Sequence, residues 1–457
     1  MGQKFAVFIA YDDEPNTKRY SAEFQTQDEY VKGWQSALKK AHHTSGQKSV
    51  ISCGCRGKGA KRLYVRSLPN SDTFILIKAA NTGTEHDPSC VFFDLDARHT
   101  GLKGYASNVV RINNEGTMSI RLGIGMTEKD PPEKSEVPSL PQIQRPEGGQ
   151  ASMTLSGLLS LLWTEVGLNV WYPNMAGKRN DSLVRYRMLE AAKQIRSGRA
   201  CIGDHLFIGV ADSKSKVASE QVQLLSSAEL SDKRLLLLSV LPRYDAEKHE
   251  KPLKFLPMRN FGGMPLTFFN SDGHWDSVKR RFPLEYAAWK NGGKVVVFAL
   301  TSPVSVTSRG ISARAHQIVL MLVSDNWIPL DSSYEAIVSR KLDAEHRHYV
   351  KPMRYDASAS DVFPDFYLLD TRSDKPFPME VFGMSTPAYL ARKELKKAYY
   401  NQEYGAYGWW HWDATEKTEY QELPHFPEAR PCFRHFVQRS YQGHSLRNLT
   451  IVVTQRQ

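Results

Sequence analysis

The chain has 457 residues, of which 41% are hydrophobic and 24% charged, a composition typical of a folded protein with several domains. Its 60 Lys and Arg outnumber its 49 Asp and Glu, which gives a net charge of +11 and a pI near 9.2. This basic balance favours a polyanionic partner, and we expect nucleic acid, DNA rather than RNA. No apolar run approaches the ~20 residues that cross a bilayer, so we expect no membrane partner.

The cysteines and the N-terminus predict a cytoplasmic protein. There are five cysteines, an odd count, and a reducing compartment suits unpaired thiols better than an oxidising one. The N-terminal apolar patch is short and is followed directly by acidic residues, which indicates a buried strand and not a secretion signal.

Residues 1–126 are predicted to form an α+β domain. The apolar segments 5–10 and 73–80 have the character of strands. Between them, residues 28–43 show helical spacing of Tyr30, Trp34 and Leu38.

Two short clusters in this region predict a structural zinc site. Cys53, Cys55, His86 and Cys90 offer three thiolates and one imidazole, the ligand set of a closed tetrahedral zinc centre. A hairpin formed by 61–68 and 73–80 would bring the two clusters together. The alternative is a set of free thiols beside a surface histidine. The basic residues near the first cluster fit a nucleic-acid contact and a solvated loop equally well: Arg56, Lys58, Lys61 and Arg62.

Residues 127–150 carry five prolines and many charges, which predicts a linker. The central α/β region, 151–325, begins with a buried helix behind the cap Thr154. A second helix, 182–198, is expected to end at Gly198. Strands follow at 205–211, 233–241, 294–304 and 316–324, with a helix within 271–290. No phosphate-binding loop or metalloprotease motif occurs here.

Residues 326–457 are predicted to form a mixed sheet flanked by helices, and they carry the most informative pattern. A helix at 331–343 is followed by a strand that starts at Pro364-Asp365-Phe366, a strand around Glu380, and a basic helix. This order resembles the PD-(D/E)xK nuclease superfamily. The resemblance implies a restriction-endonuclease-like fold in which Asp365 and Glu380 hold magnesium and Glu335 completes the site. Two carboxylates on adjacent strands suit Mg²⁺, which keeps several waters.

The sequence departs from the superfamily at Phe382, where the motif has lysine. In some relatives a lysine from the next helix replaces it, and Lys393 is our candidate for that role. Further contacts to nucleic acid are expected from the same helix: Arg392, Lys396 and Lys397. One face of this helix is polar, with Tyr389, Lys393, Lys396 and Tyr400. The other is apolar, with Ala388, Ala391, Leu395 and Ala398.

The tryptophans of the segment 404–414 favour a packed core, although such aromatics also stack on unpaired bases. Over nearly its full length, the chain resembles an uncharacterised family encoded on bacterial conjugative plasmids and integrative elements. The residues that carry this resemblance include 53–55, 86–90, 154–169, 362–371, 379–384 and 407–414. It implies plasmid-transfer or mobile-element proteins as partners. We therefore expect a Mg²⁺-dependent endonuclease acting on DNA, or alternatively a non-catalytic DNA-binding or assembly protein with a degraded nuclease fold.

Overall fold

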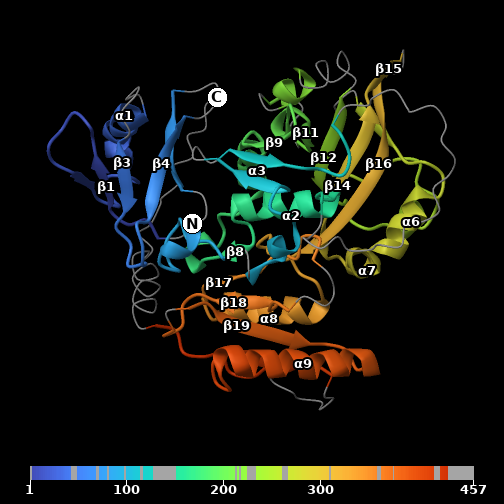
Figure 1. The fold of residues 1–457 in the computed structure, drawn as a ribbon. Helices are drawn as coiled ribbons and strands as arrows, with labels where there is room; N and C mark the ends of the chain where they lie inside the picture. Colours follow the sequence, from blue (N-terminus) through green and yellow to red (C-terminus); the bar gives the residue numbers. More distant parts are fainter. Residues whose placement is uncertain are drawn as a thin grey trace, which may run out of the picture.

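The structure is a computed structural model of the chain. It describes residues 3–42, 49–67, 72–79, 82–96, 99–113, 117–126, 151–210, 214–215, 218–223, 233–259, 266–307, 310–357, 362–373, 375–415 and 423–430. The predicted linker, 127–150, lies outside these residues. The described elements form four sheets with helices packed on them, a mixed α/β architecture (Figure 1). Short 3-10 turns occur at Asp28–Tyr30, Gly83–Glu85, Gly101–Gly104, Pro173–Met175 and Ile202–Asp204.

The N-terminal sheet is antiparallel, with the strand order β2-β1-β3-β4-β5. Its strands are β1 (Val7–Ala10), β2 (Lys18–Tyr20), β3 (Val50–Cys53), β4 (Arg62–Ser67) and β5 (Phe74–Lys78). Helix α1 (Val31–His42) packs on the sheet through Trp34 and Leu38, so the helical spacing in the sequence is confirmed. The predicted hairpin between the two metal-ligand clusters is the β4–β5 pair.

A small second sheet has the order β10-β9-β7-β6. Its strands are β6 (Val110–Ile112), β7 (Met118–Ile120), β9 (Ile195–Ser197) and β10 (Ala200–Cys201). Helix α2 (Leu155–Val166) begins at the predicted cap, because Thr154 Oγ1 accepts a hydrogen bond from the Gly157 N–H. Helix α3 (Asp181–Ala192) ends well before Gly198. The predicted end was wrong because Ile195 is buried and its strand pairs with β7, a tertiary contact that the local pattern does not reveal.

The central sheet has the order β11-β12-β14-β16-β13, with β15 paired to β16. Its strands are β11 (Leu206–Ile208), β12 (Arg234–Val240), β13 (Leu266–Phe269), β14 (Lys294–Pro303), β15 (Ser305–Thr307) and β16 (Gly310–Val323). Its helices are α5 (Ala246–His249), α6 (His274–Arg281) and α7 (Pro283–Lys290). The single helix expected within 271–290 is two, because Pro283 cannot continue the hydrogen bonding of α6 and instead starts α7.

The C-terminal sheet has the order β20-β19-β18-β17-β8. Its strands are β8 (Val170–Trp171), β17 (Tyr349–Val350), β18 (Phe366–Leu368), β19 (Phe377–Phe382) and β20 (Trp410–Asp413). Helix α8 (Ser333–Ala344) shares a core cluster with Met379 and Val381. Helix α9 (Pro387–Tyr404) packs through Tyr400 against Phe382. Because side chains alternate along β19, the two helices cover opposite faces of the sheet.

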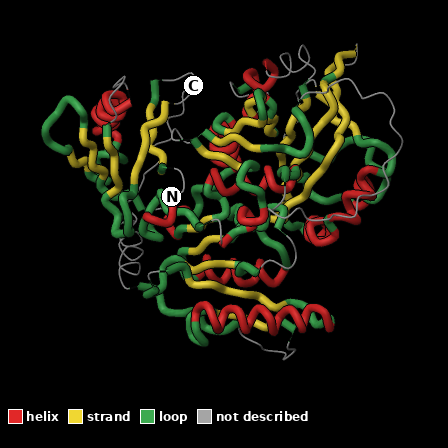
Figure 2. The backbone as a smooth tube through the Cα atoms, viewed as in Figure 1, coloured by secondary structure: helices red, strands yellow, loops and turns green. Residues whose placement is uncertain are grey.

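Two of these sheets join strands from different predicted domains. Strand β7, from before residue 126, pairs with β9 of the central region. Strand β8, also central, pairs with β17 of the C-terminal region. In Figure 2, short yellow strands lie between the central part of the molecule and the long helix α9 at the bottom of the view. The regions are therefore tied together by backbone pairing as well as by side-chain packing.

Candidate metal cluster and buried carboxylate site

Cys53, Cys55, His86 and Cys90 converge into one buried cluster in the N-terminal region. Their candidate ligand atoms all lie within 4.8 Å of one another. The Sγ atoms of Cys53 and Cys90 are 3.7 Å apart, and His86 Nδ1 lies 3.6 Å from Cys55 Sγ. A tetrahedral zinc with Zn–S bonds near 2.3 Å places its sulfur ligands about 3.8 Å apart. The four residues therefore have the chemistry and the spacing of a zinc site.

The local backbone explains why these residues meet. Cys53 ends β3, and the turn that follows carries Cys55 against the segment 85–87. Gly57 makes this approach possible, because a Cβ there would stand 2.0 Å from the carbonyl oxygen of Glu85. The N–H of Asp87 points to Cys55 Sγ at 3.4 Å, and that of Phe92 to Cys90 Sγ at 3.5 Å. Backbone N–H groups directed at sulfur stabilise the thiolate form that binds metal.

In the C-terminal region, Asp365 and Glu380 face each other across the antiparallel pair β18–β19. Phe366 and Met379 are partners in the strand register, and Asp365 and Glu380 are the next residues opposite each other. The Asp365 N–H also donates to the Met379 carbonyl, 3.0 Å away. Both carboxylates are buried. The arrangement of the two acids that the sequence pattern predicted is thus present in the described sheet.

Each carboxylate is held by donors from the protein. Asp365 Oδ2 accepts from the Val381 N–H at 2.8 Å, and Oδ1 pairs with Arg354 at 3.2 Å. Glu380 Oε1 contacts Lys396 Nζ, and Oε2 accepts from the Tyr400 hydroxyl at 3.1 Å. Burial raises the pKa of Glu380 to about 7, and the negative charge of Asp365 adds to this rise, while Lys396 opposes it.

Helix α9 turns its polar face inward and its apolar face outward. Lys393, Lys396 and Tyr400 are buried, whereas Leu395 is 70% exposed. An isolated amphipathic helix would pack the opposite way. The reason is that Glu380 and Asp413 lie under the helix and need partners, and a buried unpaired carboxylate costs more than an exposed leucine.

The lysine that contacts Glu380 is Lys396, whereas Lys393 pairs with Asp413 on β20. The three residues expected to contact nucleic acid therefore differ in their surroundings. Lys396 is buried, Lys397 is half-buried beside Glu394 at 3.6 Å, and Arg392 is half-buried.

Glu335 belongs to a second charged group beside Asp365. It is buried at the start of α8, and its Oε2 lies 2.6 Å from Lys351 Nζ. Lys351 also contacts Asp331 at 2.9 Å. Burial raises the pKa of Glu335 to about 8 even though Lys351 opposes the shift, and the nearby charges of Asp331 and Asp365 contribute to the rise.

Arg354 joins the two groups. Its guanidinium lies 2.8 Å from Asp331 and 3.2 Å from Asp365. Partial burial lowers the pKa of Arg354, but the charges of the two acids outweigh this effect and raise it. Ion pairs therefore connect Glu335 of α8 to Asp365 by way of Arg354, and the separate ion pair of Glu380 with α9 lies across the strand pair. Buried carboxylates with raised pKa values beside cations are typical of functional sites, although structural ion-pair networks also produce them.

Sequence reasoning missed Asp331, Lys351, Arg354 and the pairing role of Asp413. Lys351 and Arg354 lie just after the buried strand β17 and before Asp365, so two cations between consecutive core strands were the available signal. A second missed contact is the bidentate pair of buried Arg347 with Asp370, at 2.9 and 3.0 Å.

The tryptophans of the 404–414 segment are buried, as predicted for a core. Trp410 and Trp412 pack with α8, and Trp409 stacks on Tyr400 with ring centroids 5.0 Å apart. Among the described residues, the one group of three or more His, Cys, Asp or Glu with converging ligand atoms is the Cys/His cluster. Within the described part of the chain, no helix combines the length and apolar character needed to cross a bilayer.

Comparison with known proteins gives a family without an assigned activity. Residues 20–415 match the family described as proteins of unknown function, DUF1173. Searches of curated proteins and of solved structures returned no match. The match spans the metal cluster, the central sheet and the buried carboxylates. The chain therefore belongs to the DUF1173 family.

Proposed function

We propose that this protein is a metal-dependent nuclease that acts on DNA, with its site at Asp365 and Glu380. The observation that carries the proposal is that Asp365, directly before β18, lies opposite Glu380 on β19, whose carboxylate contacts a lysine ammonium. Lys396 thus supplies, from α9, the cation that Phe382 cannot supply from β19. The restriction-endonuclease-like fold, the magnesium and the mobile-element setting with its partner proteins are part of this proposal.

The proposed roles follow from the contacts. Asp365 and Glu380 offer oxygen ligands, and Mg²⁺ in proteins often takes only one or two carboxylates and keeps its waters. Bound there, magnesium would supply a water of lowered pKa and charge for the attacked phosphate. Lys396 orients Glu380 and offers positive charge at the same place. The ion pair of Glu335 with Lys351 lies near Asp365 on the side of α8 and contributes to the electrostatic field at that carboxylate.

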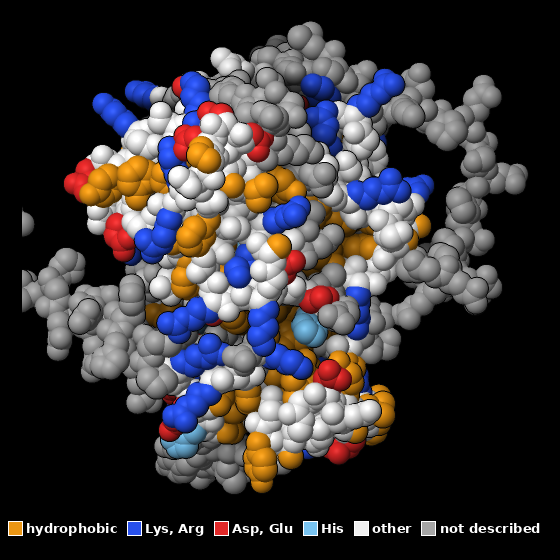
Figure 3. Space-filling model, turned by 60° about the vertical axis from the view of Figure 1, so that its left-hand side comes forward, with side chains coloured by type: hydrophobic (Ala, Val, Ile, Leu, Met, Phe, Trp, Pro, Cys, Tyr) orange, Lys and Arg blue, Asp and Glu red, His pale blue; other side chains and the backbone are white. Residues whose placement is uncertain are grey.

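The surface charge supports a nucleic-acid substrate. The net charge is +11, and Lys and Arg side chains gather in the lower half of the face drawn in Figure 3. Cations that displace counterions from phosphates provide most sequence-independent affinity for DNA.

The test is cleavage of plasmid and single-stranded DNA by the full chain, with Mg²⁺, Mn²⁺ or EDTA. The wild type is compared with Asp365→Asn and Glu380→Gln, which keep the shape of each side chain. We expect metal-dependent nicking that both variants reduce by at least about a hundredfold, the scale on which electrostatic groups act in catalysis.

Lys396→Ala and Lys393→Ala form a matched pair on α9. If Lys396 is the lysine of the site, Lys396→Ala loses cleavage, and Lys393→Ala, whose partner is Asp413, retains more of it. Circular dichroism confirms that each variant is folded. Cleavage that persists in both Asp365→Asn and Glu380→Gln contradicts the assignment.

The second candidate is a DNA-binding or assembly protein without catalysis. It is favoured by the burial of both carboxylates and by the protein donors on all four of their oxygens. This candidate predicts salt-sensitive binding of DNA with no turnover in any metal.

For the N-terminal cluster, we infer a structural zinc held by Cys53, Cys55, His86 and Cys90. The tetrahedral spacing, the N–H groups on two sulfurs and the complete burial of four ligands support a closed site without a free position.

A further inference from the structure

A surface basin lies far along the chain from the carboxylates and from the Cys/His cluster. It has a volume of about 350 Å³ and opens between the start of α6 and strand β16. Its lining includes Ser271, His274, Ser302, Arg314 and His316. None of these side chains has a role in the proposed cleavage site.

The lining is rich in groups that donate hydrogen bonds to anions. Arg314 and His316 are both exposed on β16, and neither side chain has an ion-pair partner among the described residues. The register of β14 and β16 shifts here, from Leu300–Gln317 to Thr301–Ala315, so His316 is the extra residue of a β-bulge. Bulges redirect side chains, and they are frequent beside functional sites.

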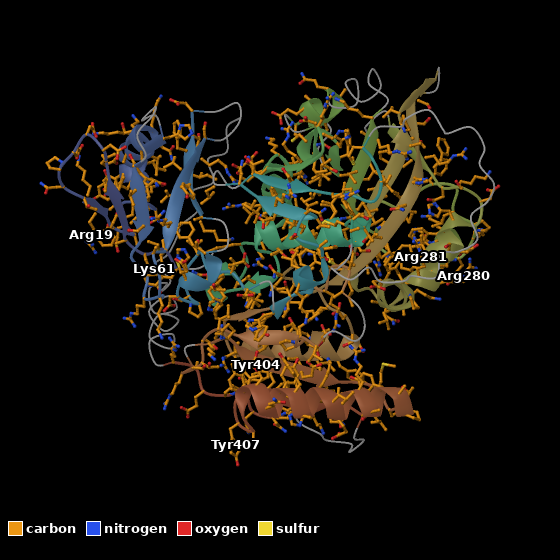
Figure 4. All side chains as sticks on the ribbon, viewed as in Figure 1. Arg19, Lys61, Arg280, Arg281, Tyr404 and Tyr407 are labelled. Carbon is orange, nitrogen blue, oxygen red and sulfur yellow. The ribbon has the colours of Figure 1, made fainter. Side chains whose placement is uncertain are left out.

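Arginine side chains lie on both elements that border the basin, α6 and β16. Burial lowers the pKa of His274, and the neighbouring Arg281 and His316 lower it further. Arg281 donates to the Ile318 carbonyl at 2.9 Å, which ties α6 to β16 beside the basin. Asp272 is the one acidic residue among the described residues that line the basin. Figure 4 shows Arg280 and Arg281 on α6, beside β16 and at the opposite side of the molecule from Arg19.

The backbone adds donors to those of the side chains. Helix α6 has Gly273 as its N-cap, so no side chain caps its first N–H groups. The N–H groups of Trp275 and Asp276 have no backbone or side-chain acceptor within the described residues. An anion in the basin would meet Arg314 and the two histidines beside the N-terminus of α6.

We propose that this basin binds a phosphate group of a nucleic-acid chain, as a contact separate from the cleavage site. The proposal takes nucleic acid as the partner from the proposed function, but it does not depend on cleavage. An exposed arginine and an exposed histidine, two positions apart on an open surface, offer a charge and hydrogen-bond donors to a polymer backbone that passes across the molecule. A phosphate contact of this kind strengthens binding without reading sequence.

The experiment measures the affinity of the full chain for fluorescent single- and double-stranded DNA across salt concentrations, with EDTA present. The variant is Arg314→Ala/His316→Ala, and the matched control is Arg19→Ala, an exposed arginine on β2. We expect the double variant to bind DNA about tenfold more weakly. The slope of its log affinity against log salt concentration should be shallower by about one unit or more, because fewer counterions are released. The control should bind like the wild type.

Three results would overturn the proposal: unchanged affinity in the double variant, an equal loss in Arg19→Ala, or no DNA binding by the wild type. Inorganic phosphate at constant ionic strength should compete more strongly with DNA on the wild type than on the double variant. At saturating DNA the double variant should retain any cleavage, whereas Glu380→Gln should retain binding. The two readouts therefore separate failure of the basin from failure of the cleavage site.

Discussion

The Cys/His cluster and the carboxylate site are both buried groups of metal-binding residues, but they are stabilised differently. At the Cys/His cluster, the partners of the sulfurs are one another, His86 and backbone N–H groups. At the carboxylate site, Arg354 and Lys396 already neutralise Asp365 and Glu380. The Cys/His cluster thus has ligands for a metal ion but no positively charged side chain beside them. At the carboxylate site, positively charged side chains already offset the negative charge.

This difference separates two uses of buried metal ligands. Four converging ligands without a counter-charge indicate a metal that contributes to folding, because metal affinity then adds directly to stability. Paired carboxylates can remain folded without metal, so a metal there would serve chemistry and not architecture. The predictions below test this distinction, from the largest expected effect to the smallest.

Replacement of a cluster ligand should have the largest effect. Cys90→Ser removes one thiolate, so we expect loss of bound zinc and destabilisation on the order of 5 kcal/mol or more. Metal analysis and thermal unfolding with and without a chelator measure both. Cys201→Ser is the control, because Cys201 lies outside the cluster and is only half-buried. One zinc per chain in Cys90→Ser would contradict the assignment.

Two neighbouring residues on α9 test the inward polar face. Lys396 is 8% exposed and Leu395 is 70% exposed. Lys396→Ala leaves Glu380 buried without its cation, which should cost about 3–5 kcal/mol of unfolding free energy. Leu395→Ala should change it by less than about 1 kcal/mol. Chemical denaturation of both variants gives the comparison, and the reverse order would mean that α9 packs on its apolar face.

The pH dependence of stability tests the charge on Glu380. Its pKa is about 7 in the folded chain, above the usual 4.5. The folded state therefore binds more protons than the unfolded state between these values, so stability falls as pH rises from about 4.5 to 7. The contribution is up to about 3 kcal/mol. Glu380→Gln removes this titration, so the stability of the variant relative to the wild type should increase with pH. A constant difference between them across this range would show that Glu380 is not shifted.

Local sequence patterns were sufficient for most elements and for the metal cluster. The cap Thr154, the proline that begins α9 and the alternation within the strands act over a few residues, and the structure follows them. The Cys/His ligands come from two short segments joined through a hairpin, so their meeting could be predicted. The end of α3 could not, because strand β9 forms only where β7 is available to pair with it.

The sequence by itself determined the strand and helix composition, the four soft ligands, and the pairing of Asp365 with Glu380 on successive strands. Only the tertiary structure decided which lysine meets Glu380, which face of α9 is buried, and which cations balance Asp365. The physical reason is that a buried carboxylate takes its partner from whatever cation packs nearest, and that neighbour comes from a distant segment. Helical periodicity predicts a face, but the charge beneath the helix determines which face turns inward.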